Sequence, residues 1–221
     1  MTETIALAVH DTAERPDIHI TIEDDASPIV RLIGRTLKDA VAVGHDIVQL
    51  RTLNATVALR SHDTPQAATI TFCDGEIAVS SGVFVDPDAT ITADLNSRFS
   101  PIGDQIGAEA LISTVLQALN PPTADWREAA QVFWESARSV RGIPDVLHVI
   151  AAASDGGIEQ LTVGAGSSEY LIAGPPEILA GIFSGADDLI AALSSGAIGI
   201  RGTLSQLSVM TGASWKVRYD V

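Results

Sequence analysis

The stretch ATVALRSHDTPQAATITFCDGEIAV, residues 55–79, decides the fold class, because apolar and polar residues alternate along most of it. A period of two places successive side chains on opposite faces of a strand, so the stretch predicts three β-strands. Asp74-Gly75 supplies the positive-φ residues of a tight hairpin turn between the second and third strands. A fourth strand is expected at 89–93, and we expect the four to form a consecutive antiparallel meander.

A helix is predicted immediately before this meander. Ser27-Pro28 is typical of a helix start, with a serine N-cap and a proline at the first helical position. Apolar residues then recur at helical spacing through 29–50, which predicts one amphipathic helix with a buried side. Alternating isoleucines predict a strand at 18–22. The segment 1–17 is expected to be partly flexible, although apolar residues alternate at 5–9 as in an edge strand.

The double proline Pro121-Pro122 is the strongest internal boundary, because it ends a helix predicted within 106–119. Beyond it the order of elements repeats, which predicts an α+β fold of two similar halves, 18–120 and 123–221. Each half is expected to be a mostly antiparallel, twisted sheet covered by amphipathic helices. The second half should contain a helix, three strands, helical segments, a short strand, a short helix and a final edge strand, at 124–140, 146–151, 158–163, 170–173, 178–193, 198–200, 204–210 and 215–221.

Charge and composition narrow the classes of partner. The chain has 28 Asp and Glu against 13 Lys and Arg, a formal net charge of −15, so nucleic acid is an unfavourable partner. With 46% hydrophobic and 5% aromatic residues, the core must be mainly aliphatic. Cys73 is the only cysteine, which excludes an internal disulfide and suits a reducing compartment. The amino terminus lacks a signal-peptide pattern and no apolar run approaches the ~20 residues of a membrane span, so we expect a cytoplasmic protein without stable membrane insertion.

No catalytic or metal-binding constellation stands out in the sequence. The five histidines are scattered without ligand spacing, and no serine lies in a Gly-x-Ser-x-Gly elbow. Asp187-Asp188 is interpreted as a helix start rather than an acid–base pair, because neighbouring helical residues point about 100° apart. The adjacent acid favours a buried or idle thiol at Cys73. Trp126 and Trp134 are interpreted as core or dimer contacts. The sequence therefore predicts a non-enzymatic protein without metal or cofactor.

Two stretches resemble a known family. Asp86-Pro87-Asp88-Ala89-Thr90-Ile91-Thr92 resembles a strand of the sterol carrier protein family of lipid-binding domains, and 176–210 is similar to the carboxy-terminal part of the same domain. The likeness covers about residues 54–95 in one half and 170–212 in the other. The resemblance implies two degenerate copies in tandem, each a twisted, mostly antiparallel sheet covered by helices. It also implies an apolar tunnel between sheet and helices that takes sterols, fatty acids or acyl-CoA.

The resemblance also implies which residues would form the site. The tunnel wall would include eight apolar residues of the second half: Ile178, Leu179, Ile182, Phe183, Leu189, Ile190, Leu193 and Leu207. The chain departs from the family at Ala197, where a basic residue is usual, and at Thr203, where an acid or amide is common. Arg201, Lys216 and Arg218 remain as candidates for contact with a head group. The alternative interpretation is that Lys216 and Arg218 form the solvent face of an edge strand.

The leading hypothesis is therefore non-covalent binding of a lipid-like ligand such as a fatty acid, acyl-CoA or sterol, for transfer or for presentation to another protein. The alternative is a closed tunnel. In that case the chain would be an interaction scaffold, whose second-half helices would contact a partner protein or a second copy in a homodimer.

Overall fold

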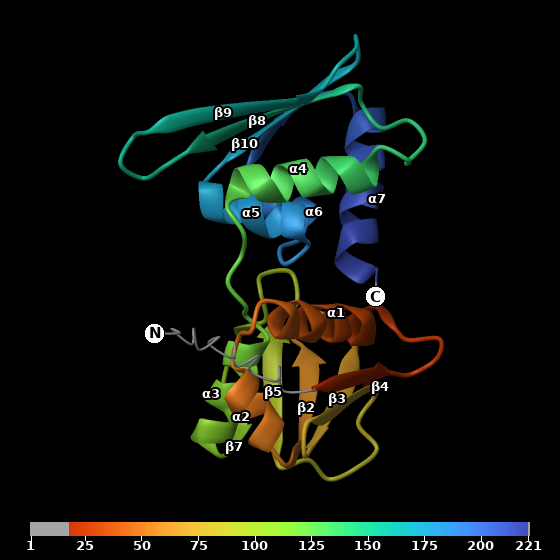
Figure 1. The fold of residues 1–221 in the computed structure, drawn as a ribbon, viewed down its shortest axis with the longest axis vertical. Coiled ribbons are helices and arrows are strands. Elements are labelled where there is room, and N and C mark those ends of the chain that lie inside the picture. Colours follow the sequence, from red (N-terminus) through yellow and green to blue (C-terminus); the bar gives the residue numbers. More distant parts are fainter. Residues whose placement is uncertain (1–17, 221) are drawn as a thin grey trace, which may run out of the picture.

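The computed structural model describes residues 18–220, which form two stacked α+β lobes (Figure 1). Each lobe has a sheet with helices packed against it and a hydrophobic core cluster of its own, the first built from 29–119 and the second from 126–213. The predicted α+β class with two halves is confirmed. The alternation at 5–9 lies outside the described residues.

The first lobe begins with a strand and a long helix and ends with a helix. Its elements are β1 (His19–Ile22), α1 (Pro28–Ala42), α2 (Ile47–Thr52), β2 (Ala55–Ser61), β3 (Ala67–Cys73), β4 (Glu76–Ser81), β5 (Ala89–Asp94), β6 (Ser100–Pro101), β7 (Ile106–Gly107) and α3 (Glu109–Ala118). The sheet order is β1-β4-β3-β2-β5-β6, with β7 also paired to β5. Helix α1 packs its apolar side on this sheet and lies on the side that faces the second lobe (Figure 1).

Two predictions for this lobe are wrong. The helix expected over 29–50 breaks after Ala42, because Gly44 and Asp46 both adopt positive φ, 73° and 53°, and a new helix starts at Ile47. The meander is antiparallel only from β2 to β4. Strand β5 instead crosses over and pairs in parallel with β2. Alternation along a strand fixes its faces but not its neighbours, so the sequence pattern carried no information about this crossover.

The second lobe has a smaller sheet and a longer final helix. Its elements are α4 (Trp126–Ala137), β8 (Val146–Ala152), β9 (Ile158–Gly164), β10 (Glu169–Gly174), α5 (Pro176–Ser184), α6 (Leu189–Ser194), β11 (Gly199–Arg201) and α7 (Leu204–Tyr219). The sheet order is β11-β10-β8-β9, and β10 pairs in parallel with β8. Helices α4, α5 and α6 lie between this sheet and the first lobe (Figure 1).

The two sheets share part of their connectivity. In the order β3-β2-β5-β6 of the first sheet, the first pair is antiparallel, the second parallel and the third antiparallel. The second sheet, β9-β8-β10-β11, has the same three kinds of pairing in the same order. Only the first sheet adds β4 and β1 outside its hairpin, and only the second lobe places two helices, α5 and α6, between its last two strands.

The final edge strand predicted at 215–221 is wrong, because α7 continues as a single helix to Tyr219. Thr203 and Gln206 form a capping box that starts the helix. The alternating Val217 and Tyr219 contact different cores, Val217 the second and Tyr219 the first. A helix that contacts two lobes needs apolar residues on more than one side. Over the five residues 215–219, such a distribution gives the same alternation of apolar and polar residues as a strand.

Candidate functional site between the lobes

The structure gathers the eight predicted wall residues into one cluster of the second lobe. Leu179, Ile182, Phe183 and Leu189 are at most 2% exposed, and the other four pack half-buried against the same core. The ring of Phe183 lies 5.3 Å from that of Phe133 on α4. These side chains therefore belong to a packed core between α4–α7 and the sheet, and their role in lining a tunnel stays a prediction.

Three polar atoms inside this second core have no hydrogen-bond partner within residues 18–220. They are Tyr170 Oη, Trp134 Nε1 and Ser214 Oγ. Burial raises the pKa of Tyr170 to about 12, so its hydroxyl is neutral at any ordinary pH. Both predicted core tryptophans, Trp126 and Trp134, are buried here, which confirms their interpretation as core residues. Buried polar atoms are usually hydrogen-bonded, so three unpaired atoms in one core are unusual. The polar groups of the second core are therefore less completely hydrogen-bonded than those of the first.

The three basic candidates for a head-group contact are not brought together. Arg201 precedes α7, whereas Lys216 and Arg218 lie in its last turn, and a 16-residue helix is about 24 Å long. Arg201 and Lys216 are exposed. Arg218 is fully buried and is neither at a tunnel mouth nor on a solvent face as predicted, because helix α7 turns it into the contact between the lobes.

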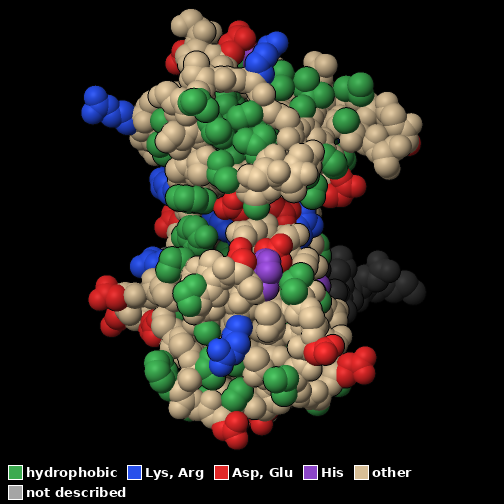
Figure 2. All heavy atoms as spheres, turned by 180° about the vertical axis from the view of Figure 1, so that it is seen from behind, with side chains coloured by type: hydrophobic (Ala, Val, Ile, Leu, Met, Phe, Trp, Pro, Cys, Tyr) green, Lys and Arg blue, Asp and Glu red, His purple; other side chains and the backbone are tan. Residues whose placement is uncertain are grey.

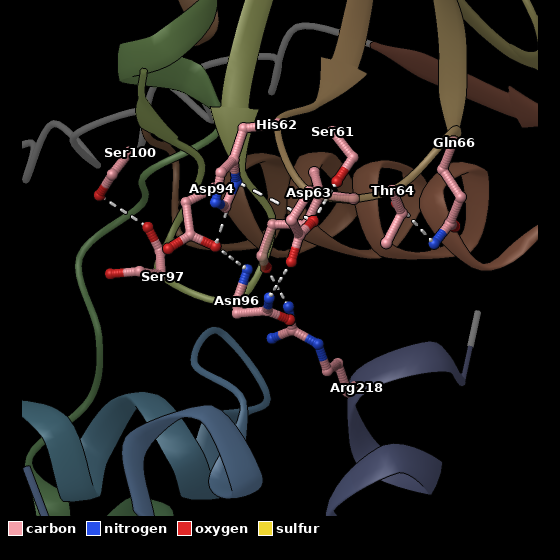
Figure 3. Close-up of polar contacts among 11 residues, drawn as sticks. Ser61, His62, Asp63, Thr64, Gln66, Asp94, Asn96, Ser97, Ser100 and Arg218 are labelled. Atoms are coloured by element: carbon pink, nitrogen blue, oxygen red, sulfur yellow. Dashed lines mark hydrogen bonds and ion pairs between the residues drawn. The ribbon is translucent and has the colours of Figure 1, made fainter. Parts of the chain in front are cut away.

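Arg218 joins the two lobes through backbone carbonyls. Its Nη1 donates to the oxygens of Gly185 and Ala186, at 2.8 and 2.9 Å, and its Nη2 donates to the oxygen of Leu95 in the first lobe. Figure 3 shows this side chain reaching from α7 toward the segment that holds Asp94 and Asn96. A guanidinium presents five donors in a fixed fork, so it can bind several carbonyls at once.

Two further arginines of the first lobe bind the same α5–α6 region. Arg98 Nε donates to Asp187 Oδ2 at 3.0 Å, and Arg98 Nη2 donates to the carbonyl of Glu177. Arg35 on α1 donates to the carbonyl of Ser184. Figure 2 shows Lys/Arg and Asp/Glu side chains gathered at the narrowing between the lobes. Three of the 13 Lys and Arg residues of the chain therefore lie at the contact between the lobes.

A backbone hydrogen bond and two glycines allow the α5–α6 region to pack closely on the first lobe. Asp188 N–H donates to the carbonyl of Asn96 at 3.0 Å. A Cβ at Gly181 would overlap the Asp187 carboxylate, and one at Gly185, where φ is 80°, would overlap Arg35. The interpretation of Asp187-Asp188 as a helix start is confirmed at its second residue, because Asp188 caps α6 through Ala191 N–H.

A polar cluster in the first lobe holds the segment that Arg218 contacts (Figure 3). Asn96 N–H donates to Asp94 Oδ1 at 2.8 Å, Asn96 Nδ2 donates to Asp63 Oδ2 at 3.3 Å, and Ser61 donates to Asp63 Oδ1 at 2.6 Å. His62 Nδ1 lies 3.9 Å from Asp63 and 4.0 Å from Asp94. Over residues 18–220 no group of three or more His, Cys, Asp or Glu could hold a metal ion. The hydrogen bonds of the cluster hold residues 94–96 against Asp63.

A cavity of about 210 Å³ opens between the lobes beside these arginines; we call it the junction cavity. Its apolar lining comes mainly from the end of α1, the end of α3 and the linker, with Ala42, Val43, Phe99, Leu119, Pro121 and Pro122. Its polar lining includes Arg35, Asp39 and Arg98. Larger openings of about 280 and 480 Å³ lie beside α6 and along α3, and Ile178 is the one predicted wall residue in the first of these.

Electrostatics at the junction cavity are balanced rather than basic. Arg35 lies 3.3 Å from Asp39, and Arg98 is paired with Asp187. Burial raises the pKa of Asp39, and the Arg35 charge opposes this shift. Burial lowers the pKa of Arg35. One side of the cavity can therefore both donate and accept hydrogen bonds, which suits an uncharged polar group at the end of an apolar molecule.

The sequence patterns did not single out Arg35, Asp39, Arg98 and Phe99, because these residues come from separate elements. The structure marks two of them through their backbone conformation: Arg98 and Phe99 both have positive φ, 44° and 53°. Consecutive non-glycine residues in this region are strained and often mark a functional segment. Cys73 is exposed at the end of β3, so of the two predicted alternatives the buried thiol is wrong, whereas the idle thiol stays a prediction.

No family model and no curated protein matches the chain. Among solved structures it is similar to the sterol carrier protein domain 2 of Helicoverpa armigera, with 12% identity and a TM-score of 0.35 over 43% of this chain and 87% of that one. It is similar to sterol carrier protein 2 of Yarrowia lipolytica, with 11% identity and a TM-score of 0.31 over 43% and 88%. A UbiJ-SCP2 ubiquinone synthesis protein shares 10% identity and a TM-score of 0.24 over 90% of this chain and 98% of its own.

The first two of these structures belong to the family that residues 86–92 and 176–210 resemble. Within the part of the chain that the structure describes, no helix is both long and apolar enough to span a membrane.

Proposed function

We propose that the chain binds a lipid-like apolar molecule without a covalent step, and that the junction cavity receives it. The observation that carries the proposal is the cavity's lining, in which apolar side chains, mainly of the first lobe and the linker, surround one polar side formed by Arg35, Asp39 and Arg98. Apolar surface that leaves water in such a cavity contributes about 25 cal/mol per Å². The paired charges on the polar side favour a guest with a hydroxyl or carbonyl end.

The size of the cavity limits what it can enclose. Pockets that enclose a drug-sized ligand measure roughly 300–1,000 Å³, and the junction cavity has about 210 Å³. It would therefore hold one end of a fatty acid, acyl-CoA or sterol. The rest of the guest would remain outside the cavity.

The predicted tunnel is an alternative location for the same guest. The eight wall residues cover the second sheet, and the three unpaired polar atoms lie in their core. Because Leu179, Ile182, Phe183 and Leu189 are already buried against one another, a guest there would require α5–α7 to separate from β8 and β10.

Displacement of a fluorescent fatty acid from the purified full chain tests the function and the location together. Ala42→Trp places an indole at the mouth of the junction cavity, on an exposed helical position. It should weaken binding about tenfold or more, since overfilling a site costs about 1–3 kcal/mol. Ala110→Trp, on an exposed position of α3 outside the cavity, is the matched control and should bind normally.

Two other results are informative. Binding that survives Ala42→Trp but is lost in Leu207→Trp would move the guest to the predicted tunnel. Absence of both probe binding and lipid in an organic extract of the fresh protein would reject the function. In that case the second candidate, a ligand-free scaffold, would stand, and the close packing of the second-lobe wall favours it.

A further inference from the structure

Strand β9 leaves a long sheet edge without a partner. Within residues 18–220 it pairs only with β8, through all seven residues from Ile158 to Gly164. Figure 1 shows it along the outer border of the second lobe, with no element beyond it. Its outward backbone N–H and C=O groups are therefore free to pair with another strand.

The first sheet covers the corresponding edge. There β4 pairs with the outer side of β3, and β1 pairs with the outer side of β4. The other terminal strands of the two sheets are short: β1 has four residues, β6 two and β11 three. The seven-residue β9 is thus the longest terminal strand in the described sheets.

Residues 158–164 lack most of the devices that protect an edge strand. They contain no Lys, Arg or Pro, and the pairing with β8 runs without a bulge. Natural sheets block exposed edges with lysine, proline or bulges. The one charged residue, Glu159, is paired with Arg127 on α4. Ile158 is 68% exposed.

The segment is complementary to itself about Leu161. In an antiparallel pair centred on that residue, Glu159 lies opposite Val163 of the second copy, Gln160 opposite Thr162, and Ile158 opposite Gly164. No like charges face each other. A register centred on Glu159 would instead oppose two carboxylates, which is unfavourable. A symmetric pairing of this kind closes after two copies.

We propose that two copies of this chain associate through β9, antiparallel and centred on Leu161, to form one continuous sheet with four strands from each copy. The inference is independent of the ligand proposed above. The contact is a narrow strip of backbone bonds, so the dimer should exchange with monomer and depend on protein concentration.

A cysteine at the symmetry centre tests the register. Facing residues of an antiparallel pair have Cα atoms about 4.5–5.5 Å apart, within the range that a disulfide spans. Leu161→Cys in a Cys73→Ser background should therefore give a covalent dimer under mild oxidation. Thr71→Cys in the same background is the control, since it is equally a strand position but lies on β3, between β2 and β4. It should remain monomeric.

Sedimentation of the full chain tests the association itself. Gln160→Lys with Thr162→Lys places lysines opposite lysines and should weaken the dimer at least tenfold, while an unchanged thermal melt shows that the lobes remain folded. Mixing this variant with the Gln160→Glu, Thr162→Glu chain should restore dimers, because opposite charges then face each other. The proposal is overturned if the unmodified chain is monomeric at high micromolar concentration, or if the double lysine variant dimerises equally well.

Discussion

Arg218 is a buried cation whose partners are carbonyl oxygens rather than a carboxylate. It donates hydrogen bonds to the carbonyl of Leu95 in one lobe and to those of Gly185 and Ala186 in the other, while its Nε lacks a partner within the described chain. A buried charge is tolerated only when it is hydrogen-bonded, so this side chain fixes the distance between the lobes. The sequence around Arg218 gave no sign of this, because its contact with the first lobe is made to Leu95, 123 positions away.

Arg218→Met should destabilise the chain substantially. The methionine keeps most of the apolar stem but leaves three buried carbonyls without donors, at about 1–3 kcal/mol for each unsatisfied group. We expect a loss of roughly 3 kcal/mol in the free energy of unfolding, measured by urea titration. Arg201→Met, at an exposed position, should change it by less than about 0.5 kcal/mol. Equal effects of the two substitutions would show that Arg218 does not connect the lobes.

Asp187 predicts a pH dependence with a defined sign. Burial raises its pKa above 3.8, and Arg98 only partly opposes the shift. The folded chain therefore takes up this proton at a higher pH than the unfolded chain does, so the associated stability is present below pH 3.8 and is lost as the pH rises through the folded pKa. Relative to Asp187→Asn, the unmodified chain should gain stability as the pH falls from 7 toward 4. Urea titrations of both chains across this range measure the difference, and a constant or decreasing difference would contradict the assignment.

At the scale of elements, periodicity predicted where helices and strands lie but not how they end or pair. The strands at β2, β3, β4, β5, β8, β9 and β10 follow the expected alternation. The failures are at 43–46, where positive φ breaks a helix, at 106–107, which form β7, and at 215–219, which continue α7. In each case contacts from elsewhere in the fold, or a local backbone conformation, overrode a short apolar pattern.

Two helical glycines should respond in opposite directions to the same substitution. Gly212 lies inside α7, and a Cβ there would meet nothing within 4 Å, so Gly212→Ala should stabilise the chain by roughly 0.5–1 kcal/mol. Gly181 lies inside α5, but a Cβ there would overlap the Asp187 carboxylate and Arg98. Gly181→Ala should therefore lower the melting temperature despite its better helix propensity. A stabilising Gly181→Ala would mean that α5 does not pack this closely on the first lobe.

For the whole molecule, the sequence predicted two halves but not the contact between them. The eight wall residues were named from the resemblance to the sterol carrier protein family; they lie together in the second core, and their role in lining a tunnel stays a prediction. The junction cavity could not be found, because its walls come from α1, from the segment after β5, from the linker and from the α5–α6 turn. No local pattern links Arg35 with Ser184, which lie 149 positions apart. The Pro121-Pro122 boundary was the one part of the cavity visible beforehand, and it was interpreted only as a linker.

The junction should make the two lobes unfold together. All three tryptophans, at 126, 134 and 215, lie in the second lobe, so tryptophan fluorescence reports that lobe alone, whereas far-ultraviolet circular dichroism reports both. In the unmodified chain the two signals should share one midpoint, as expected for a single cooperative transition.

Arg35→Met with Arg98→Met removes the arginine links to Ser184, Glu177 and Asp187 and leaves each hydrophobic core intact. The midpoints of the two signals should then separate, because each lobe retains its own core cluster but loses part of the coupling between them. Coincident midpoints in the double variant would mean that α7, through Arg218 and Tyr219, is sufficient to couple the lobes.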